Sequence, residues 1–140
     1  MQSRLFGLTA ALTAVVTAGC GLMGTEPGEP SKQSGQITVG DHTRQTRTVS
    51  CNQVEWVMTI EASADRGRAD AYLQLGGERP IVKTVGVEVD DVHAAVGGDV
   101  GKAEASTDGN IYTITGTAVG SDRADPGQTK DMPFKIEAPC

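Results

Sequence analysis

Apolar and polar residues alternate through most of the chain after its first 35 residues, and this pattern constrains the fold more than any other feature. Strict alternation puts successive side chains on opposite faces of a strand and is typical of half-buried β-strands. The clearest run places Val54, Trp56, Met58 and Ile60 on one face. Since no stretch beyond the amino-terminal segment has helical apolar spacing, we expect an all-β domain of about seven to nine antiparallel strands.

Turn signals between alternating runs predict two hairpins. One turn is Gly76-Gly77 and the other is Asp108-Gly109. Both dipeptides accept the positive φ angles of tight hairpin turns. The runs that flank these turns are 69–75 with 80–89, and 102–107 with 110–119. A last run over 134–140 ends the chain, and the simplest fold is a small antiparallel β-sandwich over residues 36–140.

Aromatic residues make up only 4% of the chain, so Val, Ile, Leu and Ala must supply most of the core. We expect the few rings in that core to be Trp56, Tyr72, Tyr112 and Phe134.

The first 20 residues have the parts of a secretory signal. Arg4 gives a positive start, residues 5–16 are apolar, and small residues precede Cys20. The apolar run is shorter than the roughly 20 residues that span a membrane. We therefore predict a lipoprotein signal peptide over 1–19, cleavage before an acylated Cys20, and a flexible linker over 20–35. The alternative is an incidental Cys20 beside an ordinary signal-peptidase site.

The three cysteines fit an exported chain once Cys20 is assigned to lipid. Cys51 and Cys140 then remain as a pair, and an oxidising compartment favours a disulfide between them. Such a bridge closes a long loop and contributes about 4 to 5 kcal/mol in the chain-entropy model. Free thiols with a redox or metal role are the alternative, although no C-x-x-C pair is present.

Residues that commonly carry chemistry are sparse. His42 and His93 stand singly, so no zinc-binding pattern can be drawn, and Asp90, Asp91 and Asp99 lack the spacing of a calcium loop. We predict no enzyme activity, no catalytic residues, no metal and no cofactor. The formal net charge of −6 argues against a nucleic-acid partner.

Several segments together resemble the nineteen-kilodalton lipoprotein antigen family of mycobacteria. They are the signal ending at Cys20, Ile37-Thr38-Val39, Thr48-Val49-Ser50-Cys51, and the runs 80–86, 105–120 and 134–140. The resemblance implies a lipoprotein of the cell envelope, anchored on the extracytoplasmic face of the cell membrane by its acylated terminus. It also implies a surface antigen whose acylated terminus is sensed by a host Toll-like receptor. The linker here is shorter and poorer in Thr, Ser and Ala than that of the antigen.

Two function classes follow. The first is a non-catalytic envelope lipoprotein and surface antigen. The second is a carrier that holds an envelope lipid or glycolipid inside the β-domain, which would require a pocket of roughly 300 to 1,000 Å³ in a core that has few large side chains.

Overall fold

The computed structural model describes residues 34–140, which form one all-β unit. The predicted signal peptide (1–19), Cys20 and nearly all of the predicted linker lie outside the described residues. The strands are β1 (Gln36–Val39), β2 (His42–Val54), β3 (Val57–Ala64), β4 (Gly67–Gln74), β5 (Ile81–Val89), β6 (Val92–Gly97), β7 (Lys102–Asp108), β8 (Ile111–Asp122) and β9 (Lys130–Pro139).

Eight of the nine strands close into a barrel. The order across the sheet is β6-β5-β4-β3-β2-β1-β9-β8-β7, and β6 pairs a second time, with β8. Every pairing is antiparallel. The predicted sandwich is therefore wrong, because the two layers belong to one continuous sheet.

Strand β8 makes this closure. Its first part, from Ile111 to Thr117, pairs with β7, and its last part, from Val119 to Asp122, pairs with β6. Strand β9 pairs with β8 along both parts. Strand β7 therefore extends outside the ring, and among residues 34–140 it pairs with β8 alone.

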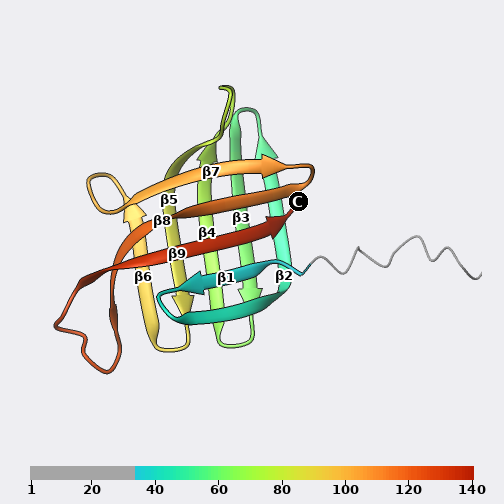
Figure 1. Ribbon diagram of the computed structural model, residues 1–140. Coiled ribbons are helices and arrows are strands. Elements are labelled where there is room, and N and C mark those ends of the chain that lie inside the picture. Colours follow the sequence, from blue (N-terminus) through green and yellow to red (C-terminus); the bar gives the residue numbers. More distant parts are fainter. Residues whose placement is uncertain (1–33) are drawn as a thin grey trace, which may run out of the picture. The chain divides into compact units, whose positions relative to one another are not determined.

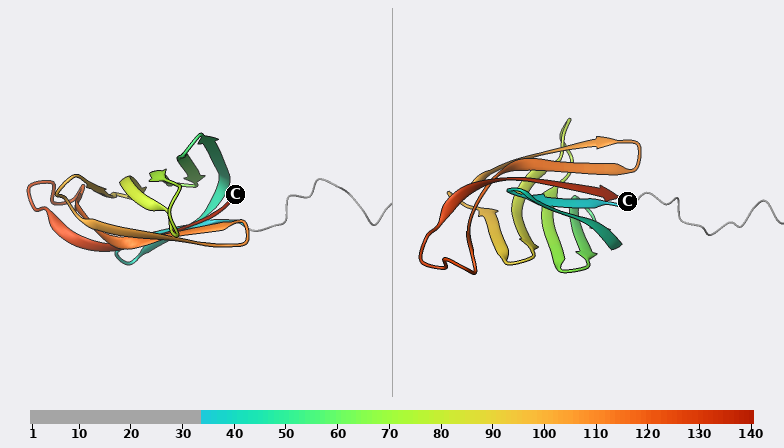
Figure 2. Two further views of the ribbon diagram at one scale, coloured as in Figure 1. Left: turned by 90° about the horizontal axis from the view of Figure 1, so that it is seen from above. Right: turned by 60° about the horizontal axis from the view of Figure 1, so that its bottom comes forward.

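Strand β2 makes the opposite corner. In Figure 1, β3, β4, β5 and β6 run up and down, while β1, β9, β8 and β7 cross them at a steep angle. Figure 2 shows the two layers from above. The start of β2 pairs with β1 and the remainder pairs with β3, with an irregular register between Thr46 and Thr48. Bulges bend strands, so this one lets β2 pass from one layer to the other.

The core lies between the two layers and is built from aliphatic side chains, as the composition predicts. The largest fully buried residues are Ile37, Val39, Ile60, Leu73, Val85, Val89, Ile114 and Ile136. Both predicted hairpins are confirmed, as β4–β5 and β7–β8. The core, the closed sheet and the disulfide all lie within 34–140, so this part of the chain has what an independently folding domain needs.

The expectation for the aromatic residues is mostly wrong. Trp56 and Val54 are 67% and 62% exposed, because the predicted strand is interrupted by a turn at Glu55-Trp56. Glu55 has a φ of 52°, which residues other than glycine seldom adopt. Neither Glu55 nor Trp56 is a residue type that commonly forms turns, so the turn could not be predicted from the sequence. Tyr72 lies on the exposed face of β4 and Tyr112 is half-buried, whereas Phe134 is buried in the core.

Candidate functional site

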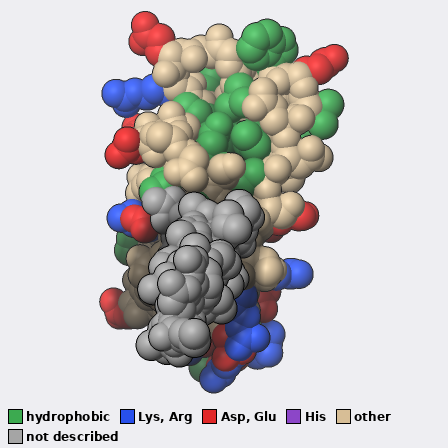
Figure 3. Space-filling model, turned by 90° about the vertical axis from the view of Figure 1, so that its right-hand side faces the viewer, with side chains coloured by type: hydrophobic (Ala, Val, Ile, Leu, Met, Phe, Trp, Pro, Cys, Tyr) green, Lys and Arg blue, Asp and Glu red, His purple; other side chains and the backbone are tan. Residues whose placement is uncertain are grey.

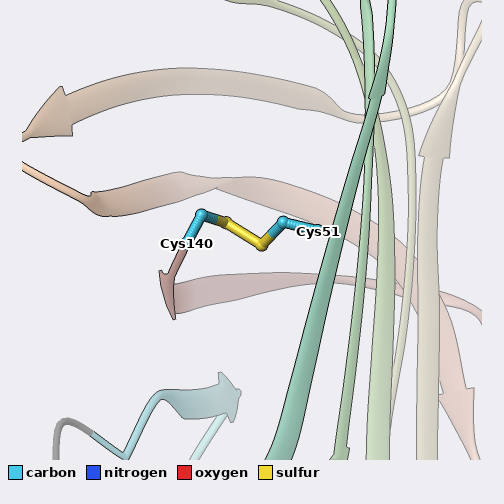
Figure 4. Close-up of a disulfide and its surroundings, with 2 residues drawn as sticks. All are labelled: Cys51 and Cys140. Carbon is cyan, nitrogen blue, oxygen red and sulfur yellow. A yellow bond between two sulfur atoms is a disulfide. The ribbon is translucent and has the colours of Figure 1, made fainter. Parts of the chain in front are cut away.

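A disulfide joins the end of β9 to β2. Cys51 and Cys140 are bonded, with their Cα atoms 5.7 Å apart, and Figure 4 shows the bridge running from the chain end to β2. Strand β1 lies between β2 and β9 in the sheet, but it pairs only up to Gln36. The bridge therefore connects β2 and β9 beyond the end of β1, where no strand of the described domain joins them.

A charged cluster around Asp90 joins two hairpin turns to the start of β2. Arg44 donates from Nη2 to Asp90 Oδ1 at 2.7 Å, and His42 Nδ1 lies 3.1 Å from Oδ2. Arg66 Nε is 3.8 Å from Oδ1, and the Arg66 carbonyl accepts the Asp90 backbone N–H. The hydrogen bond from Arg44 lowers the pKa of the Asp90 carboxyl most, and the contact with His42 lowers it further. Partial burial of the carboxyl acts in the opposite direction and raises this pKa. The cluster ties the β5–β6 turn to β2 and to the β3–β4 turn.

His93 and Ser121 are neighbours across the β6–β8 seam. Their side chains are 3.2 Å apart, from His93 Nε2 to Ser121 Oγ, and Ser121 is only 5% exposed. A catalytic serine needs an accessible hydroxyl and a base oriented by a third group. Within residues 34–140 no carboxylate is hydrogen-bonded to His93. The pair is better explained as a polar contact that supports the seam.

The acidic residues considered for calcium are not brought together. Asp90 and Asp91 precede β6, whereas Asp99 lies in the loop after it, and Asp91 faces Arg123 at 4.0 Å. Across the described part of the chain, no group of three or more metal-ligating side chains is found. A glycine-rich turn follows β6, with reciprocal backbone hydrogen bonds between Gly97 and Val100.

An open cleft of about 430 Å³ separates the start of β5 from β7. One wall is formed by the segment from Arg79 to Val82, and the other by β7 and the neighbouring part of β8. Its lining mixes apolar side chains, such as Val82 and Ala105, with hydroxyls such as Ser106. No sequence signal marked this cleft, because its walls are 20 or more positions apart and meet only through the barrel closure.

A second open depression, of about 490 Å³, adjoins it through Ile81 and lies beside Trp56. The Trp56 ring packs against Gly76. The backbone carbonyl of Trp56 accepts a hydrogen bond from the Leu75 backbone N–H. Ile81 is itself 54% exposed. Figure 3 shows apolar side chains gathered in the upper part of one side of the domain, with charged side chains around them. Exposed apolar side chains with charged residues around them are typical of surfaces that contact another macromolecule.

The described residues contain no helix that could cross a membrane.

Comparison with known proteins gives a consistent result. A family model described as Mycobacterium 19 kDa lipoprotein antigen matches residues 28–140. The chain is 30% identical over 142 residues to a protein of Mycobacterium tuberculosis named probable lipoprotein LppE, with all of both chains covered. It is 43% identical over 67 residues to lipoprotein LpqH of Mycobacterium avium, covering 46% of this chain and 42% of that protein. LpqH of Mycobacterium tuberculosis is 42% identical over a stretch of the same length.

Proposed function

Since the chain belongs to the Mycobacterium 19 kDa lipoprotein antigen family, we propose that it is anchored in the cell membrane through an acylated Cys20 and exposes its β-domain on the extracytoplasmic side. The observation that carries the proposal is the family match over the whole described domain, together with the small residues before Cys20. Acyl chains contribute about 0.8 kcal/mol per buried methylene, so two or three chains bind almost irreversibly.

The acylated terminus is proposed to engage a host Toll-like receptor, and the β-domain to act as a non-catalytic surface module. The positions of His42 and His93 support this division. His42 contacts Asp90 in the cluster that joins the turns, and His93 contacts Ser121 at the β6–β8 seam. The domain then provides a stable, disulfide-closed surface while the lipid supplies receptor recognition.

The packing of the core favours a surface module over a lipid carrier. Ile60, Leu73 and Ile114 fill the space between the layers and are at most 1% exposed. A carrier needs a cavity of roughly 300 to 1,000 Å³ that encloses most of its ligand. The clefts described above lie instead at the surface, beside β5 and β7.

The Cys20→Ala variant tests the anchor. In a mycobacterial host, we expect this variant to lose acylation and to show at least tenfold less receptor activation per mole of protein than the wild type, because a single acyl attachment site serves both properties. Labelling with an alkyne fatty acid measures acylation, and a reporter cell line that expresses Toll-like receptor 2 measures activation.

The matched control is the double variant Cys51→Ser/Cys140→Ser, which removes the other two cysteines and leaves Cys20. After normalisation to the protein in the membrane fraction, it should retain acylation and receptor activation. A Cys20→Ala variant that is still labelled and fully active would refute the proposed anchor.

A further inference from the structure

The outer edge of β7 has no partner strand in the described domain. All seven residues of β7 pair with β8 on one side, and no backbone hydrogen bond to another segment is found on the other side within residues 34–140. Unpaired edges expose N–H and C=O groups that readily accept another strand. Pro80 to Val82 lie across the open cleft from this edge, so the cleft keeps it accessible.

The sequence of β7 is complementary to itself in one antiparallel register. When two copies are paired about a two-fold axis at Ala105, Lys102 of each copy lies opposite Asp108 of the other. Glu104 then lies opposite Ser106, which is neutral. Opposite charges at directly paired positions stabilise antiparallel strands, and like charges destabilise them.

The two neighbouring registers are unfavourable. A two-fold axis at Glu104 would place the two copies of Glu104 opposite each other, and an axis at Ser106 would place Glu104 opposite Asp108. Intermediate registers would pair core-facing with solvent-facing side chains, because residues alternate between faces. The charges of β7 therefore select the register centred on Ala105.

The core-facing side of β7 also suits a second strand. Its side chains there are small, with Ala105 buried and Ala103 half-buried. A partner strand continuing the sheet would present the same small side chains toward the cleft wall, where Ile81 is 54% exposed. The added strand would cover this isoleucine without displacing a large side chain.

We propose that this protein forms a two-fold symmetric homodimer through antiparallel β7–β7 pairing, in the register that places Lys102 opposite Asp108 of the second copy. The interface joins two barrels through one continuous sheet.

Charge reversal tests the dimer and its register. Residues 34–140 would be secreted without the amino-terminal segment, and sedimentation equilibrium would measure association of the wild type up to about 500 µM, a range that includes weak interfaces. We expect a monomer–dimer equilibrium. Lys102→Glu and Asp108→Lys should each raise the dissociation constant at least roughly tenfold, because each reversal creates two like-charge pairs per dimer.

The double variant Lys102→Glu/Asp108→Lys should restore the wild-type dissociation constant to within about threefold, because it exchanges the two charges across the interface. Lys130→Glu reverses the charge of an exposed residue at the start of β9 and should leave association unchanged. A wild type that is monomeric throughout the range would overturn the proposal, as would a dimer that the single reversals leave intact. Capture of a different peptide on β7 by a monomeric domain would likewise overturn it.

Discussion

At the scale of single residues, Asp90 joins more cationic partners than the other carboxylates discussed above. Its carboxylate accepts hydrogen bonds from Arg44 and lies beside His42 and Arg66. The side chain of Asp90 is only 18% exposed. Its left-handed backbone, with a φ of 55°, is one that Asp and Asn tolerate better than other residues. Asp90 therefore combines a turn conformation with a charge that joins neighbouring hairpins.

We predict that the folded domain becomes less stable in acid partly because of Asp90. The pKa of this carboxyl is lower in the folded protein than its ordinary value of about 3.9. Its ionised form therefore stabilises the fold above that value, and the contribution is lost as the pH falls below it through the folded pKa. Urea unfolding of Asp90→Asn should show lower stability than the wild type at pH 7 and a shrinking difference below pH ~4.

Asp91→Asn is the control for this prediction, since Asp91 is 58% exposed and its nearest cation, Arg123, is 4.0 Å away. It should unfold like the wild type at both pH values. A difference between Asp90→Asn and wild type that stays constant from neutral to acidic pH would contradict the assignment.

Gly120 is the residue that lets β8 approach β6 closely. A Cβ atom at this position would collide with the His93 carbonyl oxygen and with Ala94. Gly120→Ala should therefore destabilise the domain by about 1 to 3 kcal/mol, the usual cost of overpacking. Hydrogen exchange should show the amides of residues 92–95 losing protection before those of β3 and β4.

Gly127→Ala is a matched control, because nothing lies within 4 Å of the point that a new Cβ would occupy there. Its unfolding free energy should stay within about 0.5 kcal/mol of the wild type. If both glycine variants were equally stable, close approach at the seam would not be what Gly120 provides.

At the scale of elements, the disulfide links β9 to β2 beyond the end of β1, the strand that pairs with both of them. Cys51→Ser/Cys140→Ser should lower the unfolding free energy by about 2 to 5 kcal/mol, because the bridge restricts a long loop of the unfolded chain. Urea titration of the double variant measures the loss, and the reduced wild type should show the same midpoint. A loss below about 1 kcal/mol would mean that strand pairing alone closes this side of the barrel.

The sequence predicted some elements well and others poorly, for identifiable reasons. The β7–β8 hairpin was predicted correctly, because Asp108-Gly109 marks the turn and alternation of apolar and polar residues marks both strands. Most of β2 was missed, because Thr46 is its only buried residue and a strand without an apolar face has no periodic signal. Trp56 was placed in the core because its turn contains no glycine, proline or asparagine.

At the scale of the whole molecule, all-β class, disulfide and family could be recognised in the sequence, whereas barrel closure could not. Closure depends on β8 changing partner from β7 to β6 at Ala118, and alternation is the same whichever strand lies alongside. The cleft beside β7 depends on that closure. The cluster around Asp90 depends on turns that are far apart in the sequence and meet in the fold. Local patterns therefore predicted several of the strands but neither of these sites.

A lipid on Cys20 that anchors this domain underlies the whole proposed function. Intact mass spectrometry of the full-length gene product, purified from the membranes of a mycobacterial host, tests it most directly. We predict a mature chain that begins at Cys20, carries a diacylglycerol and an amide-linked fatty acid, and keeps Cys51 and Cys140 oxidised. A mature chain that begins elsewhere, or a Cys20 without lipid, would contradict the lipid anchor.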